Sequence, residues 1–155
     1  MKELLRPCEH MRAKTTMKIY RTYRELSSIK TIEERFEYLK IGGRVGEVTF
    51  GVDRYLNQIF YKSNVWIPLR DKIIARDLGC ELGLRGYEIS GSIIIHHINP
   101  IEIEDVLTRA PEILDPEYLI CTSLNMHNAI HYGDKKVLSS ITYTPRSKND
   151  TCPWR

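Results

Sequence analysis

Four of the five histidines lie in two clusters, and the second cluster begins thirty residues after the first one ends. His96 and His97 end an apolar run, whereas His127 and His131 are spaced four residues apart. Residues at that spacing share one face of a helix, with Cβ atoms about 5–6 Å apart, so this pair can bind one cation. Imidazole binds first-row transition metals, and an unbound neutral histidine can take a proton from water near pH 7. The four side chains therefore suit metal-assisted hydrolysis of a phosphodiester, unless they are ordinary core or surface histidines.

A strand and a helix are expected to position these imidazoles. The apolar run at 92–98 predicts a strand that ends at a turn at 99–100. Residues 123–133 predict a short helix, because Ser123 can cap its start and Gly133 can end it. Adjacent strand residues point to opposite faces, so the two neighbouring histidines can serve one site only if the strand end twists or breaks.

The rest of the chain predicts further helices and strands from apolar periodicity and from glycine and proline breaks. Thr31 and Glu34 form a capping-box pattern at the start of one helix. Pro68 lies inside another helix, which must begin near this residue or be kinked there. A glycine between two apolar runs predicts a hairpin that includes the histidine strand. The expected elements are helices at 31–41, 53–61 and 63–76, a short helix within 101–114, and strands at 87–89, 92–98 and 118–121.

The composition favours one small domain that does not cross a membrane. The chain has 155 residues, of which 42% are hydrophobic, and it contains no run of about eighteen apolar residues. Residues 1–7 hold no apolar stretch long enough for a signal peptide. The four cysteines are far apart and form no Cys-x-x-Cys pair, which argues against a disulfide framework and against a structural zinc site. We therefore expect a cytoplasmic protein.

Charge is distributed unevenly along the chain. Residues 1–30 carry eight Lys and Arg against three Glu, and residues 135–155 carry five against one Asp. Residues 96–134 carry one Arg against seven acids. Basic ends suit a protein that neutralises nucleic-acid phosphates, but soluble terminal arms have the same composition, and charge alone does not decide between them. Four more basic residues are candidates either for DNA contacts or for solvated helix positions: Arg70, Lys72, Arg76 and Arg85.

The histidine segments resemble those of HNH endonucleases, and more narrowly those of small HNH proteins encoded by bacteriophages of Gram-positive bacteria. The similar segments are 93–100, 116–120 and 127–134, with weaker matches at 50–58, 70–74 and 150–154. This resemblance implies an α+β fold. Its core would be a ββα-metal (His-Me finger) unit, in which a cation lies between a strand pair and a helix. Two or three short helices would precede this core.

The resemblance also implies a role for each histidine. His96, His127 and His131 would bind one divalent cation, which is Mg²⁺, Mn²⁺, Ni²⁺ or Zn²⁺. His97 would be the general base that deprotonates the attacking water. The expected activity is hydrolysis of double-stranded DNA, either in phage DNA packaging beside terminase or portal proteins or in homing. The alternative is a catalytically inactive, metal-stabilised module that docks on DNA or on the terminase.

One position departs from the family's pattern. The loop between strand and helix is normally held by an asparagine, whose place is taken here by Tyr118. Asn125 and Asn128 are the candidates to replace it. The expected organisation is a basic N-terminal arm at 1–30, an HNH domain with its N-terminal helices at 31–138, and a C-terminal tail at 139–155.

Overall fold

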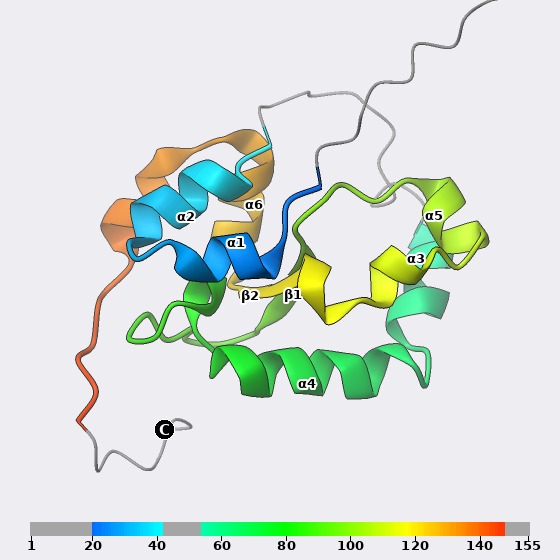
Figure 1. Cartoon of the computed structure of the whole chain (residues 1–155), viewed down its shortest axis with the longest axis horizontal. Helices are drawn as coiled ribbons and strands as arrows, with labels where there is room; N and C mark the ends of the chain where they lie inside the picture. Colours follow the sequence, from blue (N-terminus) through cyan, green and yellow to red (C-terminus); the bar gives the residue numbers. More distant parts are fainter. Residues whose placement is uncertain (1–19, 42–53, 148–155) are drawn as a thin grey trace, which may run out of the picture.

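The computed structural model describes residues 20–41 and 54–147, and their fold is α+β (Figure 1). No helix in these two ranges is long and apolar enough to cross a membrane. The similarity noted at 50–53 and 150–154 lies outside the described residues. The elements in chain order are α1 (Tyr23–Ser28), α2 (Ile32–Leu39), α3 (Arg54–Tyr61), α4 (Trp66–Asp77), the 3₁₀ turn η2 (Glu81–Gly83), β1 (Ile94–His97), α5 (Ile103–Leu107), η3 (Pro111–Leu114), η4 (Pro116–Tyr118), β2 (Leu119–Thr122), α6 (Leu124–Tyr132) and η5 (Lys135–Ser140).

Local capping determines where several helices begin and end. α2 begins after Thr31, whose side chain accepts a hydrogen bond from the backbone N–H of Glu34, as the capping-box pattern predicts. α4 begins at Trp66, so Pro68 lies in its first turn, where a missing N–H removes no intrahelical bond. The residue after α4, Leu78, adopts the left-handed conformation with a φ of 55°. Both helices lie where the sequence predicts them.

The two strands form one antiparallel sheet, in which Ile94 of β1 lies opposite Thr122 of β2. The predicted hairpin between 87–89 and β1 is wrong, because Glu88 forms only an isolated bridge with Cys80. The physical reason is burial. β1 is covered on both faces and needs a partner that can be buried along its whole length. β2 meets this condition, since all of its residues are buried, whereas the segment at 87–89 has a carboxylate at its centre.

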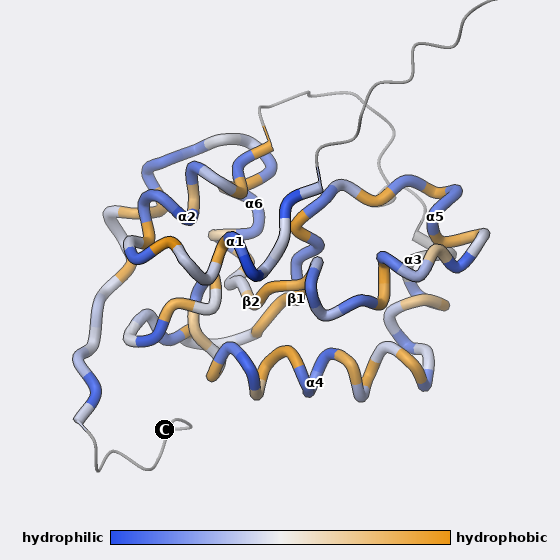
Figure 2. Tube along the Cα trace, viewed as in Figure 1, coloured by the Kyte–Doolittle hydropathy of each residue, from blue (hydrophilic) through white to orange (hydrophobic). Residues whose placement is uncertain are grey.

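The sheet separates two apolar layers. In Figure 1, α4 runs along one side of the strand pair and α6 lies on the other, and Figure 2 shows hydrophobic residues on the strands and along α4. Ile120 of β2 packs in the layer formed with α1, α2 and α6, whereas Leu119 and Cys121 pack in the layer formed with α3 and α4. His96 lies opposite Ile120, and His97 lies opposite Leu119. The two neighbouring histidines therefore face different layers.

The folded unit extends beyond the boundaries predicted at residues 30 and 138. Leu26 of α1 is fully buried in the core. The backbone of Arg21 donates one hydrogen bond to the side chain of Asn99 and accepts another from it. At the other end, the backbone N–H of Thr144 donates to the carbonyl of Gly86. The described parts of the expected arm and tail therefore pack on the domain.

An ion pair at the end of α4 holds β2 in place. The buried carboxylate of Asp77 accepts hydrogen bonds from the Arg76 guanidinium at 2.7 and 3.1 Å and from the backbone N–H of Cys121 at 2.9 Å. Arg76 also donates to the backbone carbonyls of Pro116 and Leu119, each at 2.7 Å. These bonds satisfy polar groups that would be costly to bury alone. Together, Arg76 and Asp77 fasten β2 to α4.

Asp77→Asn is expected to destabilise the fold by about 2 kcal/mol, because hydrogen bonds to charged groups contribute about 1.5–3 kcal/mol each. Urea unfolding followed by circular dichroism measures this loss. Asp71→Asn is the matched control, since the side chain of Asp71 lies on the same helix and is 69% exposed. The control should change the free energy of unfolding by less than about 0.5 kcal/mol. An equal effect of the two substitutions would show that Asp77 does not hold β2.

Candidate metal centre

α6 places His127 and His131 one helical turn apart. The Ser123 hydroxyl accepts a hydrogen bond from the backbone N–H of Met126 at 3.2 Å and so caps the start of the helix. The chain leaves the helix at Gly133, which has a φ of 70°, a conformation that favours glycine. Both helix ends are those predicted from the sequence.

Three imidazoles converge between β1 and α6, and we call them the three-histidine cluster. His96 comes from β1, and His127 and His131 come from α6; each offers one ring nitrogen, and these nitrogens lie within 4.8 Å of one another. The ring centroid of His96 is 5.2 Å from that of each helical histidine, and the two helical centroids are 4.6 Å apart. Within the described part of the chain, the buried Nε2 of His96 and Nδ1 of His127 have no hydrogen-bond partner.

The cluster has the chemistry of a cation site. A buried polar nitrogen without a partner costs free energy, and such atoms are rare in folded proteins. A cation bound to the nitrogen lone pairs would remove that cost. Burial lowers the pKa of all three imidazoles, so each is neutral at pH 7, which is the form that binds metal. Three protein ligands also leave a position for water or substrate, as in catalytic zinc sites.

His97 lies outside the cluster, on the opposite face of β1. Its Nε2 is 2.9 Å from the backbone oxygen of Ile113, and its ring stacks on Trp66, with centroids 5.5 Å apart and 19° between the planes. Burial lowers the pKa of His97 to about 4, and the hydrogen bond to Ile113 opposes that shift. The strand keeps its regular register through this residue. The structure thus brings three of the four predicted imidazoles together and places the fourth behind them.

Tyr118 and Asp115 contribute to the loop that leads from β1 into β2. The backbone oxygen of Tyr118 accepts a hydrogen bond from the N–H of Ile98 at 2.8 Å. Asp115 was not predicted; its side chain caps η4, and the Asp-Pro-Glu pattern that starts there is the signal for such a cap. Asn125 and Asn128 are exposed on α6 and, among the described residues, form no hydrogen bond with this loop.

The four basic residues considered for DNA binding have different surroundings. Arg76 is engaged by Asp77 and by two backbone carbonyls. Arg70 is half-buried, and its guanidinium lies 3.4 Å from the backbone oxygen of Ile93. Lys72 and Arg85 are exposed. Of the four, these last two therefore present their charge most freely to a polyanion.

A buried glutamate supports the start of α6. Glu81 is 5% exposed, and its Oε2 accepts a hydrogen bond from the backbone N–H of Ser123 at 3.0 Å. Burial raises the pKa of Glu81, against the opposing effect of its hydrogen bonds with Ser123. Glu81 thus helps to position the helix that carries two of the clustered histidines, although its burial disfavours the charged carboxylate.

Glu81→Gln is expected to become more stable relative to the wild type as the pH rises. The folded pKa of Glu81 lies above its unfolded value of about 4.3, so the folded state binds more protons in the window above that pH. Its contribution to stability is therefore complete below about pH 4.3 and is lost as the pH rises through the folded pKa. Urea unfolding at intervals between pH 4 and pH 7 measures the difference, with the exposed Glu33→Gln as control. A difference that does not change with pH would contradict the assignment.

Comparisons with known proteins assign no family to the chain. No protein-family model, curated protein or solved structure matches it. A proposal of function therefore depends on the geometry of the three-histidine cluster and on the position of His97.

Proposed function

We propose that the protein is a metal-dependent DNA endonuclease with a ββα-metal core, as in the HNH endonucleases that its histidine segments resemble. The observation that supports this proposal is the convergence of His96 with His127 and His131. β1, β2 and α6 follow in the order strand, strand, helix, and α6 begins directly after the strand pair is complete. The three histidines would hold one divalent cation, which is Mg²⁺, Mn²⁺, Ni²⁺ or Zn²⁺.

His97 is the proposed general base. Its ring lies on the face of β1 away from the three-histidine cluster, so the proposal requires that the attacking water meets Nδ1 around the end of the strand, which is at His97. A carbonyl oxygen can only accept a hydrogen bond, so the Nε2 of His97 is protonated where it meets Ile113, and Nδ1 carries the lone pair. In the proposed step, Nδ1 takes a proton from water, the water oxygen bonds to phosphorus, and the bond from phosphorus to the 3′ oxygen breaks. The departing 3′ oxygen then takes a proton from a solvent water. A cation held by His96, His127 and His131 would supply positive charge for the phosphate and for the departing oxygen. The products carry 5′-phosphate and 3′-hydroxyl ends.

Double-stranded DNA is the proposed substrate. The exposed side chains of Lys72 and Arg85 suit contacts with its phosphates. A role in phage DNA packaging or in homing, with terminase or portal proteins as partners, comes from the family resemblance alone.

A metal-stabilised DNA-binding module without catalysis is the second candidate. The observation that favours it is the placement of His97, whose ring packs against Trp66 and Phe60 on the face of β1 away from the cluster. In this position the imidazole also serves as part of the core. Such a module would bind metal and DNA and would leave the phosphodiester bonds intact.

Nicking of supercoiled plasmid distinguishes the two candidates. Plasmid is incubated with the protein and with Mg²⁺, Mn²⁺, Ni²⁺ or Zn²⁺ in turn, and a parallel series contains a chelator. Conversion to open circles that stops in the chelator series supports the endonuclease. Retention of the supercoiled form with every metal, while the protein shifts the plasmid band, supports the module instead.

A further inference from the structure

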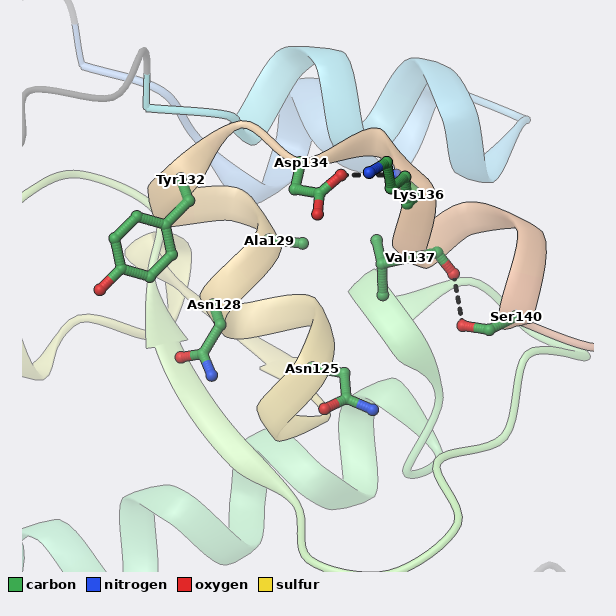
Figure 3. A pocket seen from close by; sticks show the side chains of 8 residues that line it. All are labelled: Asn125, Asn128, Ala129, Tyr132, Asp134, Lys136, Val137 and Ser140. Carbon is green, nitrogen blue, oxygen red and sulfur yellow. Dashed lines mark hydrogen bonds between the residues drawn. The ribbon is translucent and has the colours of Figure 1, made fainter.

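An open hollow lies beside α6, between this helix and η5 (Figure 3). Its volume of about 530 Å³ falls in the range of about 300–1,000 Å³ that is usual for small-molecule sites. Most of the residues that line it carry a polar group. Its lining includes Asn125, Asn128 and Tyr132 from α6, and Lys136 and Ser140 from η5.

Helix geometry places this hollow next to the three-histidine cluster. Asn128 follows His127, and Tyr132 follows His131, so each is rotated by about 100° around the helix from its histidine. In Figure 3 the amides of Asn125 and Asn128 lie on the same side of α6, and the ring of Tyr132 stands near the end of that helix. Asn128 therefore lies between the cluster and the hollow, and a DNA strand bound at the cluster would reach the hollow by crossing this residue.

Several polar groups of the hollow are available to a ligand. Within the described ranges, the amide of Asn125, the phenol of Tyr132 and the ammonium of Lys136 have no hydrogen-bond or ion-pair partner in the protein. Asp134, by contrast, is engaged, because its carboxylate accepts a hydrogen bond from the backbone N–H of Lys136 at 3.0 Å and caps η5. Tyr132 is 70% exposed, which is high for a large aromatic side chain.

We propose that the hollow binds one nucleotide of the DNA strand, adjacent to the phosphate at the three-histidine cluster. This inference rests on the proposed function and names the subsite next to the reacting bond. The amides of Asn125 and Asn128 both donate and accept, which suits the edge of a base, and the ring of Tyr132 offers a stacking surface. Lys136 suits the neighbouring phosphate. A nucleotide combines a planar ring, a hydrogen-bonding edge and a negative charge, and the hollow offers a counterpart to each.

A nucleotide in this hollow must leave the base stack of a duplex, and an unpaired nucleotide does so at a lower cost. We therefore expect the wild-type protein to bind a fluorescein-labelled duplex with one bulged nucleotide more tightly than the fully paired duplex. Fluorescence anisotropy with chelator present measures binding without cleavage. The preference for the bulge should disappear in Tyr132→Ala, and affinity for the bulged duplex should fall about tenfold, the usual scale for loss of one stacked base.

Lys136→Ala should weaken binding to both duplexes. It should also reduce the slope of the logarithm of the affinity against the logarithm of the salt concentration by about one, because one phosphate contact is lost. Two matched controls remove the same types of exposed side chain outside the hollow: Tyr143→Ala, at a position 57% exposed, and Lys30→Ala. Circular dichroism of each variant shows that it is folded before binding is compared.

The outcomes separate this proposal from the proposed function. Loss of the bulge preference in Tyr132→Ala, with both controls unchanged, supports the nucleotide subsite even if no metal produces nicking. Unchanged affinities of Tyr132→Ala and Lys136→Ala overturn the subsite even if the wild type nicks plasmid. Failure of the wild type to bind either duplex also overturns it.

Discussion

Replacement of His97 by alanine is expected to lower the rate of plasmid nicking by a factor of about 10²–10⁴, the usual contribution of a general base. The physical reason is that Nδ1 of His97 is the proposed acceptor of the proton from water. Metal affinity should not change, because the three clustered histidines lie on the other side of β1. DNA affinity should also remain, because the imidazole is buried in the core. Rates are measured from the disappearance of supercoiled plasmid under single-turnover conditions.

His97→Gln controls for the structural role of the imidazole. A glutamine amide can still donate to the backbone oxygen of Ile113 but carries no basic nitrogen. If His97 acts as the base, both variants lose nicking activity, although the glutamine variant keeps more of the stability. If the glutamine variant nicks at the wild-type rate, the imidazole serves the core alone and another group activates water.

His131→Ala should weaken zinc or nickel binding at least about a hundredfold, because removing one of three ligands costs more than the roughly 10–100-fold typical of supporting residues. His131 is the clearest choice among the three, since its side chain is half-buried and its removal leaves the core intact. Isothermal titration calorimetry gives the affinity. Thermal unfolding gives an independent reading, because a metal at a hundred times its Kd stabilises the folded wild type by about 2.7 kcal/mol.

Asn125→Ala is the matched control for the metal experiment. Asn125 lies on the same helix, is exposed and does not belong to the three-histidine cluster. It should keep both the metal affinity and the stabilisation by metal. Equal zinc affinity of the wild type and His131→Ala, or no stabilisation of the wild type by any divalent ion, would show that the cluster is not a cation site.

Features of the site that depend on local spacing were predictable. The Ser123 cap, the end of the helix at Gly133 and the shared face of His127 and His131 all follow from contacts within one or two helical turns. The same applies to α2, whose N-terminal cap is a hydrogen bond between residues three apart, Thr31 and Glu34. These contacts form between residues that are close in the sequence, so they do not depend on the tertiary packing around them.

The partner of β1 was not predictable in the same way. A glycine suggested the nearest upstream segment at 87–89, but β1 pairs with β2, which begins twenty-two residues after β1 ends. Strand pairing is decided by which segment can be buried with its neighbour and by which helices cover the sheet. The hydrogen bonds of Arg76 and Asp77 illustrate this, since they join β2 to α4, which lies more than forty residues earlier in the chain.

The sequence by itself determined that two imidazoles share a helical face and that the other two must point to opposite sides of a strand, because both are properties of backbone geometry over a few residues. Backbone geometry left open whether His96 or His97 joins the helical pair; the family resemblance assigned His96, and the tertiary structure places it there. That choice depends on the side of the sheet against which α6 packs. Burial of Ile120 with α6 in one layer, and of Leu119 with Trp66 in the other, settles it.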